Sequence, residues 1–305
     1  MKKKLPLKQT EIGLIPSEWD IISFTKVISD IVDNRGKTAP TSEKGIALIA
    51  TNCIKETGLF PVKEKVRYVS EKTYNNWFRG HPKSGDIIVV NKGTPGSVCL
   101  VPKNVDFCIA QDMVAVRPNR EKIYDRFLLA FMRSRKFKHE VDSLNVGTTV
   151  PHLKKTYFPL LKVPIPLRVE QEVIGDLYYN ISLKIEFNQR INKTLESIGD
   201  VIFRSWFVDF EFPDEEGKPY KSSGGKMVYN DELEKEIPKG WKVEKLEEIA
   251  ENFDSKRVPL SRREREQMRG SYPYYGATGI IDYVNDFIFD GLYILMGEDG
   301  SVIDE

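Results

Sequence analysis

The chain has 305 residues, of which 40% are hydrophobic and 30% are charged, and its formal net charge is +1. This composition is typical of a folded globular protein and excludes an intrinsically disordered chain. No apolar run approaches the roughly 18 residues of a membrane-spanning helix, and the Met-Lys-Lys-Lys start is not followed by the apolar segment of a signal peptide.

Residues 1–165 show short apolar runs separated by Gly-rich and Pro-rich turns. Four of these runs predict buried strands, namely 47–50, 87–90, 98–101 and 113–116. The segment from Phe127 to Phe137 predicts a short amphipathic helix. We therefore expect a mixed α+β domain over residues 1–165.

The pattern changes after Pro164 and Pro166, because residues 169–207 contain no proline and repeat apolar residues every seven positions. This predicts a helix within 166–210 that is roughly 55–60 Å long. One seam of the repeat holds Ile174, Ile181, Asn188, Leu195 and Ile202, and the other holds Leu177, Lys184, Ile191, Ile198 and Ser205. The narrow apolar stripe favours a coiled coil in which the polar Lys184 and Asn188 set register and partner choice. The alternative is an amphipathic helix lying on a globular core.

Residues 211–235 have the Pro, Gly and Ser content of a linker. After it, the phrase Ile15-Pro16-x-x-Trp19 returns 222 positions later as Ile237-Pro238-x-x-Trp241, and Arg257 repeats Arg35 at the same offset. A repeat of this period predicts two related domains, the second of them over 236–305 and incomplete. Trp19 and Trp241 are expected to be core anchors.

Charge is unevenly distributed along the chain. Residues 1–165 carry 28 Lys and Arg against 16 Asp and Glu, whereas residues 166–305 carry 18 against 29. Within the acidic part, the stretch 256–269 is locally basic. The basic first part favours a polyanionic partner, although solvated surface charge would give the same pattern.

Some fragments of the sequence resemble catalytic motifs, but their residues do not have the spacing that catalysis requires. Gly36-Lys37-Thr38 resembles the end of a phosphate-binding loop, but Ile31 stands where its first glycine is required. Asp214, Glu216 and Lys218 imitate a nuclease site, but they are contiguous in the linker, where they cannot surround one metal ion. The three histidines have no metal-ligand spacing. We predict a chain without catalytic residues, metal or cofactor of its own.

The three cysteines, Cys53, Cys99 and Cys108, form no Cys-x-x-Cys pair. This usage is typical of a reducing compartment and disfavours a disulfide framework or a structural zinc site. The sequence therefore predicts a cytoplasmic protein that does not contact a membrane.

A family resemblance rests on motifs that occur along nearly the whole chain. They are Gly-Thr-Thr-Val-Pro-His-Leu at 147–153, Val-Pro-Ile-Pro at 163–166, Glu170-Gln171, the helix ending Trp-Phe-Val-Asp-Phe at 206–210, Ile-Pro-x-x-Trp at each domain start, and Tyr-Tyr-Gly-Ala-Thr-Gly at 274–279. Their order and spacing resemble the specificity (S) subunit of type I restriction–modification systems.

The resemblance implies a function and an architecture. Residues 1–165 would be a first target recognition domain, 166–210 a spacer helix, 211–235 a linker and 236–305 a second, incomplete target recognition domain. Each domain would read half of a bipartite site in double-stranded DNA. The helix would dock modification subunits, which carry the S-adenosylmethionine-dependent adenine methyltransferase, and the restriction subunit would join that complex. The specificity subunit itself catalyses nothing.

Side chains for phosphate contact and base readout are sought in the loops between strands. The candidates are Arg35, Lys37, Thr38, Asn52, Lys55, Asn91, Lys92, Thr94, Thr148, Thr149, His152 and Lys154, and in the second domain Lys256, Arg257, Tyr275 and Thr278. Several have a purely structural alternative. The segments 34–36 and 91–93 have turn chemistry, and Arg35 with Arg257 could repeat a salt bridge.

Three other interpretations of the chain stay open. It could be a docking scaffold or recombination reservoir without DNA binding, or a fragment of a fused restriction–methyltransferase enzyme. It could also be a natural half-subunit whose helix pairs with a second copy, and such a dimer would read a palindromic bipartite site.

Overall fold

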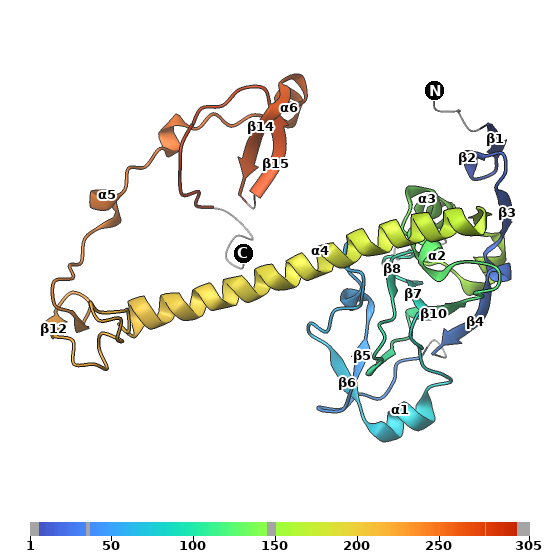
Figure 1. Ribbon diagram of the computed structural model, residues 1–305, viewed down its shortest axis with the longest axis horizontal. Coiled ribbons are helices and arrows are strands. Elements are labelled where there is room, and N and C mark those ends of the chain that lie inside the picture. Colours follow the sequence, from blue (N-terminus) through green and yellow to red (C-terminus); the bar gives the residue numbers. More distant parts are fainter. Residues whose placement is uncertain (1–5, 35–36, 145–150, 278, 298–305) are drawn as a thin grey trace. The chain divides into compact units, whose positions relative to one another are not determined.

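The computed structural model describes residues 6–34, 37–144, 151–277 and 279–297. The chain forms two compact units, residues 1–201 and 202–305, which Figure 1 colours in chain order from blue to red. The boundary between the units falls within the long helix. This boundary coincides with none of the predicted limits of the recognition domain, spacer helix and linker at residues 165, 210 and 235, which remain predictions.

Two sheets form the centre of the first unit. The larger one is antiparallel, with the strand order β4 (Ile28–Asp33), β10 (Met113–Pro118), β7 (Ile87–Val90) and β8 (Val98–Leu100). The smaller one has the order β6 (Arg67–Val69), β5 (Ile46–Ile49) and β9 (Phe107–Ile109), with β5 and β9 parallel. These strands include all four predicted from the sequence, and the predicted α+β class is confirmed.

The apolar run of β7 is buried on both of its faces. Ile87 and Val89 belong to a core cluster that includes residues of the helices, whereas Ile88 and Val90 pack in a second cluster with β5 and β9. Successive side chains of a strand point to opposite faces, so a strand between two layers must be apolar throughout. This is why its sequence shows a continuous run and no alternation.

Helices cover both outer faces of the first unit. On one side are α2 (Asp125–Met132) and α3 (Arg135–Ser143). On the other, α1 (Glu71–Trp77) packs against the second face of the smaller sheet. Three short 3-10 helices complete this unit, η1 (Phe24–Lys26), η2 (Thr51–Cys53) and η3 (Lys155–Leu160).

The single helix predicted over residues 127–137 is wrong, because the chain forms two helices there. Ser134 has an extended backbone, and its hydroxyl accepts a hydrogen bond from the backbone N–H of Phe137 at 3.3 Å. A serine in this position caps the start of a helix, so α2 ends and α3 begins. The cap lets Phe131 and Phe137 pack edge to face, with ring centroids 5.7 Å apart.

Small strand pairs join the start of the first unit to its last strand. The hairpin β1 (Leu7–Thr10) and β2 (Gly13–Pro16) precedes β3 (Asp20–Ser23), which pairs with β11 (Lys162–Ile165). The long helix begins three residues after β11 ends.

The predicted long helix is confirmed. It comprises α4 (Arg168–Phe203) and a closing π-helical turn η4 (Arg204–Val208). The alternative of a helix lying on a globular core holds for its first turns, where Ile174, Tyr179 and Leu183 pack against the core of the first unit. Beyond this part, the residues from 187 to 204 are all exposed.

The second unit contains short elements separated by loops. They are the hairpin β12 (Met227–Asn230) and β13 (Lys235–Pro238), α5 (Leu246–Ile249), η5 (Asp254–Lys256), α6 (Arg262–Gln267), and the hairpin β14 (Arg269–Gly276) and β15 (Gly279–Val284). Few of its apolar residues are buried, and Leu292 and Ile294 have relative exposures of 101% and 97%.

The sequence repeat is also a structural repeat. Ile15 pairs with Lys8 in the first hairpin and Ile237 pairs with Val228 in the corresponding hairpin. The N–H of Trp19 donates to Pro16 O at 3.1 Å, and the N–H of Trp241 donates to Pro238 O at 3.0 Å. The shared phrase thus specifies a hairpin followed by the same tight turn.

Candidate nucleic-acid interface

Several loops of the first unit meet at one edge of the larger sheet. Since neighbouring strands are antiparallel, the ends of β4 and β7 lie at the same edge as the starts of β10 and β8. The loops that begin after Asp33, Val90 and Ile109 therefore emerge together. Binding residues commonly lie on loops that a rigid sheet positions in this way.

The turn 110–112, between β9 and β10, connects these loops. Ala110 N–H donates to Ile49 O at 2.8 Å, which ties the turn to the end of β5. Asp112 O accepts hydrogen bonds from the N–H of Asn91 at 2.8 Å and of Lys92 at 3.3 Å. The amide of Gln111 donates to Thr38 Oγ1 at 3.2 Å. We call this set of loops, residues 37–38, 91–94, 110–112 and 151–154, the recognition edge.

Asn91 holds the recognition edge together. Its side-chain amide donates to Leu153 O at 2.9 Å, and Leu153 N–H donates to Asn91 O at 2.8 Å. The side chain is buried, with 6% relative exposure. The structural alternative for Asn91 therefore accounts for its position, and a base contact would require this side chain to leave its site. Next to it, Lys92 and His152 form an isolated β-bridge.

Exposed cations surround this scaffold. Lys37, Lys92 and Lys154 are exposed, and none of them forms an ion pair with another described residue. The neighbouring Lys155, in contrast, is paired with Asp33. Thr38 and Thr94 are exposed beside these lysines. Unpaired ammonium groups beside hydroxyl groups are suited to phosphate oxygens.

The other candidates of the first unit lie outside the recognition edge or outside the described residues. Asn52 and Lys55 are exposed after β5, and the Asn52 amide lies 3.5 Å from Glu64 O. Arg35, Thr148 and Thr149 lie outside the described residues.

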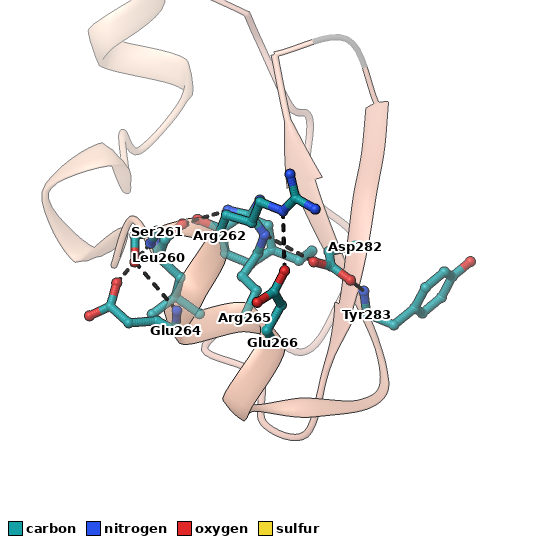
Figure 2. A network of polar contacts seen from close by, with 9 residues as sticks. Leu260, Ser261, Arg262, Glu264, Arg265, Glu266, Asp282 and Tyr283 are labelled. Carbon is teal, nitrogen blue, oxygen red and sulfur yellow. Dashed lines mark hydrogen bonds and ion pairs between the residues drawn. The ribbon is translucent and has the colours of Figure 1, made fainter.

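In the second unit much of the basic stretch 256–269 is neutralised by internal contacts. Figure 2 shows Arg265 between the Leu260 carbonyl and the Asp282 carboxylate, with Nη1 2.6 Å from Leu260 O and Nε 3.1 Å from Asp282 Oδ2. The backbone N–H of Tyr283 and then Arg265 lower the pKa of Asp282. Arg265 therefore stabilises the hairpin β14–β15 against α6, and the run of charge overstates the free positive charge.

The predicted DNA-binding residues Lys256, Arg257 and Tyr275 of the second unit are exposed, but two of them contact neighbouring side chains. Arg257 pairs with Asp254 at 3.2 Å, and the Lys256 ammonium lies 4.3 Å from the centre of the Phe253 ring. Tyr275 on β14 is 51% exposed. Thr278 lies outside the described residues.

Among the described residues, no group of three or more His, Cys, Asp and Glu side chains is placed to hold a metal ion. No helix in the described part of the chain is long and apolar enough to cross a membrane.

The model of the type I restriction modification DNA specificity domain matches residues 28–197 and 238–305. The chain belongs to this family. The match has two segments, and the gap between them contains the end of α4 and the predicted linker. The family predicted from the motifs is confirmed.

Curated relatives support the same family. The chain is 28% identical over 249 residues to the type I restriction enzyme MjaIX specificity subunit of Methanocaldococcus jannaschii, covering 79% of this chain and 54% of that protein. It is 30% identical over 136 residues to the HindI specificity subunit of Haemophilus influenzae, covering 42% of this chain and 29% of that protein. The chain thus spans about half the length of the MjaIX subunit and less than a third of the HindI subunit.

Solved structures of specificity subunits are also similar. The HsdS subunit from Thermoanaerobacter tengcongensis is 17% identical with a TM-score of 0.41, covering 61% of this chain and 42% of that one. The S subunit of a type I restriction-modification system from M. genitalium is 17% identical with a TM-score of 0.40, covering 88% and 62%.

Proposed function

We propose that this chain is the non-catalytic DNA-recognition subunit of a cytoplasmic type I restriction–modification complex, in which each recognition domain reads half of a bipartite site. The observation that carries the proposal is the recognition edge, which lies within a chain of the DNA specificity family. There, exposed Lys37, Lys92 and Lys154 lie on loops that hydrogen bonds of the turn 110–112 and of Asn91 connect.

The recognition edge supports binding to double-stranded DNA by two kinds of contact. The lysines would neutralise phosphates, which supplies affinity without sequence preference. Thr38 and Thr94 would supply directional hydrogen bonds. Because the loops are tied to one another, they would meet the duplex as one preformed surface, and less ordering free energy would be lost on binding.

The exposed part of α4 supports docking of modification subunits. Its predicted seam residues Leu177, Ile181, Ile191, Leu195, Ile198 and Ile202 have relative exposures of 62%, 54%, 55%, 59%, 48% and 42%. Lys184 and Asn188 are exposed among them. An apolar stripe of this extent on an isolated helix calls for a partner surface. Ile174 is the exception, because it packs on the chain's own core.

In this assembly the chain performs no reaction. Adenine methylation would come from the modification subunits with their S-adenosylmethionine, and cleavage from the restriction subunit that joins the complex. This chain would hold the duplex and the methyltransferase in a fixed relation. If the chain is a natural half-subunit, its exposed helix would pair with the same helix of a second copy.

The test is co-expression with the neighbouring modification subunit, followed by single-molecule sequencing for N6-methyladenine. A methylated bipartite motif is the expected result, and a palindromic motif would indicate a twofold dimer of this chain. Complex formation without methylation or DNA binding would overturn the proposal in favour of a docking scaffold or recombination reservoir. Methyl transfer by the purified chain alone would overturn it in favour of a fused enzyme.

A variant pair separates docking from DNA binding. Leu195→Asp places a charge on the exposed stripe of α4 and is expected to prevent co-purification with the modification subunit. The same variant is expected to keep the first unit folded, because residue 195 is exposed and lies beyond the part of α4 that packs on the core. Thr194→Asp on the same helix is a poorer control, because the Thr194 hydroxyl donates to Arg190 O. The control is therefore Glu196→Asp, which keeps the charge at an exposed position.

A further inference from the structure

Gln111 is a feature of the recognition edge that no sequence motif indicates. It lies in the middle of the turn 110–112, at the end of one buried strand and the start of another. Both flanking residues are fixed by backbone hydrogen bonds, Ala110 to Ile49 and Asp112 to Asn91 and Lys92. The backbone of Gln111 is thus positioned from both sheets at once.

This arrangement orients the side chain of Gln111 but uses only part of its hydrogen-bonding capacity. One amide hydrogen is directed at Thr38 Oγ1, at 3.2 Å, and the residue is half-buried. A glutamine amide offers two N–H donors and one carbonyl acceptor. No other hydrogen bond of this amide is formed with a described residue. A donor and the acceptor therefore remain for a ligand.

The surroundings of Gln111 indicate which ligand this is. Its neighbour Asp112 binds the backbone of Lys92, and Thr38, which the amide contacts, follows Lys37, so two loops that carry exposed lysines adjoin Gln111. Flanking ammonium groups suit phosphates, whereas the planar amide matches the edge of adenine, where N7 accepts and the N6 amino group donates. An amide between loops that carry exposed lysines suits base readout with phosphate contacts beside it.

We infer that Gln111 is a specificity-determining residue that pairs with an adenine in the major groove of the half-site read by the first domain. Thr38 acts as its positioning residue by holding one amide hydrogen. The inference rests on the proposed function. The adenine in question is not the methylated one, because a base that is modified must leave the duplex.

The experiment uses the complex of the full chain with its modification subunit and the duplex motif that the wild type methylates. Each adenine of the half-site is replaced in turn by 7-deazaadenine, which lacks the N7 acceptor. For the wild type, we expect weaker binding when one particular adenine is replaced. The loss of affinity should not exceed the about 5- to 150-fold that a bidentate pair provides. Gln111→Ala is expected to weaken binding to the natural duplex and to abolish the difference between adenine and 7-deazaadenine at that position.

A second variant tests the chemistry directly. Gln111→Glu replaces the donor and acceptor pair by acceptors, which suits the amino group of cytosine. The methylated motif is then expected to change from adenine to cytosine at the same position and at no other. Gln9→Ala is the matched control, since it removes an exposed amide of the same unit on the β1–β2 hairpin, and its motif is expected to stay that of the wild type.

The outcomes separate this inference from the proposed function. A wild-type complex that methylates a defined motif, together with Gln111 variants that keep the motif and its 7-deazaadenine response, would overturn the role of Gln111 alone. The 7-deazaadenine series uses the wild-type protein, so it remains decisive even if Gln111→Ala does not fold. Equal binding of all the substituted duplexes would also overturn the role of Gln111. A wild-type complex without any methylated motif would overturn the proposed function, and the inference with it.

Discussion

The indole Nε1 of Trp19 donates a hydrogen bond to Glu170 Oε2 at 3.0 Å, joining the first repeat phrase to the first turn of α4. The same carboxylate oxygen accepts the backbone N–H of Leu167 at 3.1 Å, so Glu170 also stabilises the start of the helix. The counterpart Trp241 instead packs on aromatic rings that follow the other helix end, with centroids 6.1 Å from Phe207 and 5.5 Å from Phe210. Each copy of the phrase thus contacts residues at or next to one end of the long helix, but Trp241 is 39% exposed, so the prediction of a core anchor is wrong for the second copy.

Replacing Trp19 by Phe is expected to destabilise the first unit by about 1–2 kcal/mol, because the Glu170 carboxylate loses its indole donor while the edge contact with Phe127 is retained. Chemical denaturation measures the free energy of unfolding. Trp77→Phe is the control, since the Trp77 indole contacts the Phe78 ring but forms no side-chain hydrogen bond with a described residue. Equal losses in both variants would contradict the role of the hydrogen bond.

Replacing either of two glycines of α4 by alanine is expected to change the free energy of unfolding, but in opposite directions. A Cβ at Gly175 would lie 2.6 Å from the Phe127 backbone nitrogen, whereas a Cβ at Gly199 would meet nothing within 4 Å. Gly175→Ala should destabilise the chain by about 1–3 kcal/mol, because α4 must move away from α2. Gly199→Ala should stabilise it by about 0.5–1 kcal/mol through helix propensity.

Thermal or urea unfolding of the two alanine variants, monitored by circular dichroism, checks this difference in sign. Destabilisation of the same size at both positions would contradict the close approach of α4 and α2 at Gly175.

Removing Lys92 or Lys154 is expected to weaken DNA binding about equally for all sequences. If each ammonium group contacts one phosphate, each Lys→Ala change should reduce the slope of log Kobs against log salt concentration by about 0.9. The measurement is a salt titration of binding by fluorescence anisotropy. Lys122→Ala is the matched control, because Lys122 is equally exposed but follows the opposite end of β10. An unchanged slope in the Lys92 and Lys154 variants would exclude them from phosphate contact.

The stability of the first unit is expected to decrease as the Glu140 side chain ionises. Burial raises the pKa of Glu140, and the hydrogen bond from Lys162 N–H, at 2.9 Å, offsets this in part. A raised carboxyl pKa means that the folded state binds the proton more tightly than the unfolded state does. The resulting stabilisation is present below the ordinary carboxyl pKa and is lost as pH rises through the raised one.

Glu140→Gln removes this titration. The free energy of unfolding of the wild type, minus that of the variant, should therefore decrease as pH rises from about 4, the ordinary carboxyl range, through the raised pKa of Glu140. Urea denaturation over this range measures the difference, in which the other carboxyl groups cancel. A difference that does not change with pH would refute the assignment to Glu140.

Local patterns predicted much of the fold. The apolar runs gave β5, β7, β8 and β10, because a strand buried on both faces must be apolar throughout. The heptad repeat gave α4, since apolar side chains seven residues apart lie on one helix face. The break between α2 and α3 was missed because one serine cap outweighed a continuous helical pattern.

The sequence by itself determined the family, the α+β class, the long helix and the repeat of the Ile-Pro-x-x-Trp phrase, because each is recognised from residues close together in the chain. Tertiary structure alone decided which polar and charged side chains remain available for DNA. It buried Asn91 against Leu153, engaged Arg265 with Asp282, and brought Gln111 to Thr38 across 73 residues. These partners are 17 to 73 residues apart in the sequence, and their contacts depend on how the elements pack in three dimensions, which no local spacing encodes.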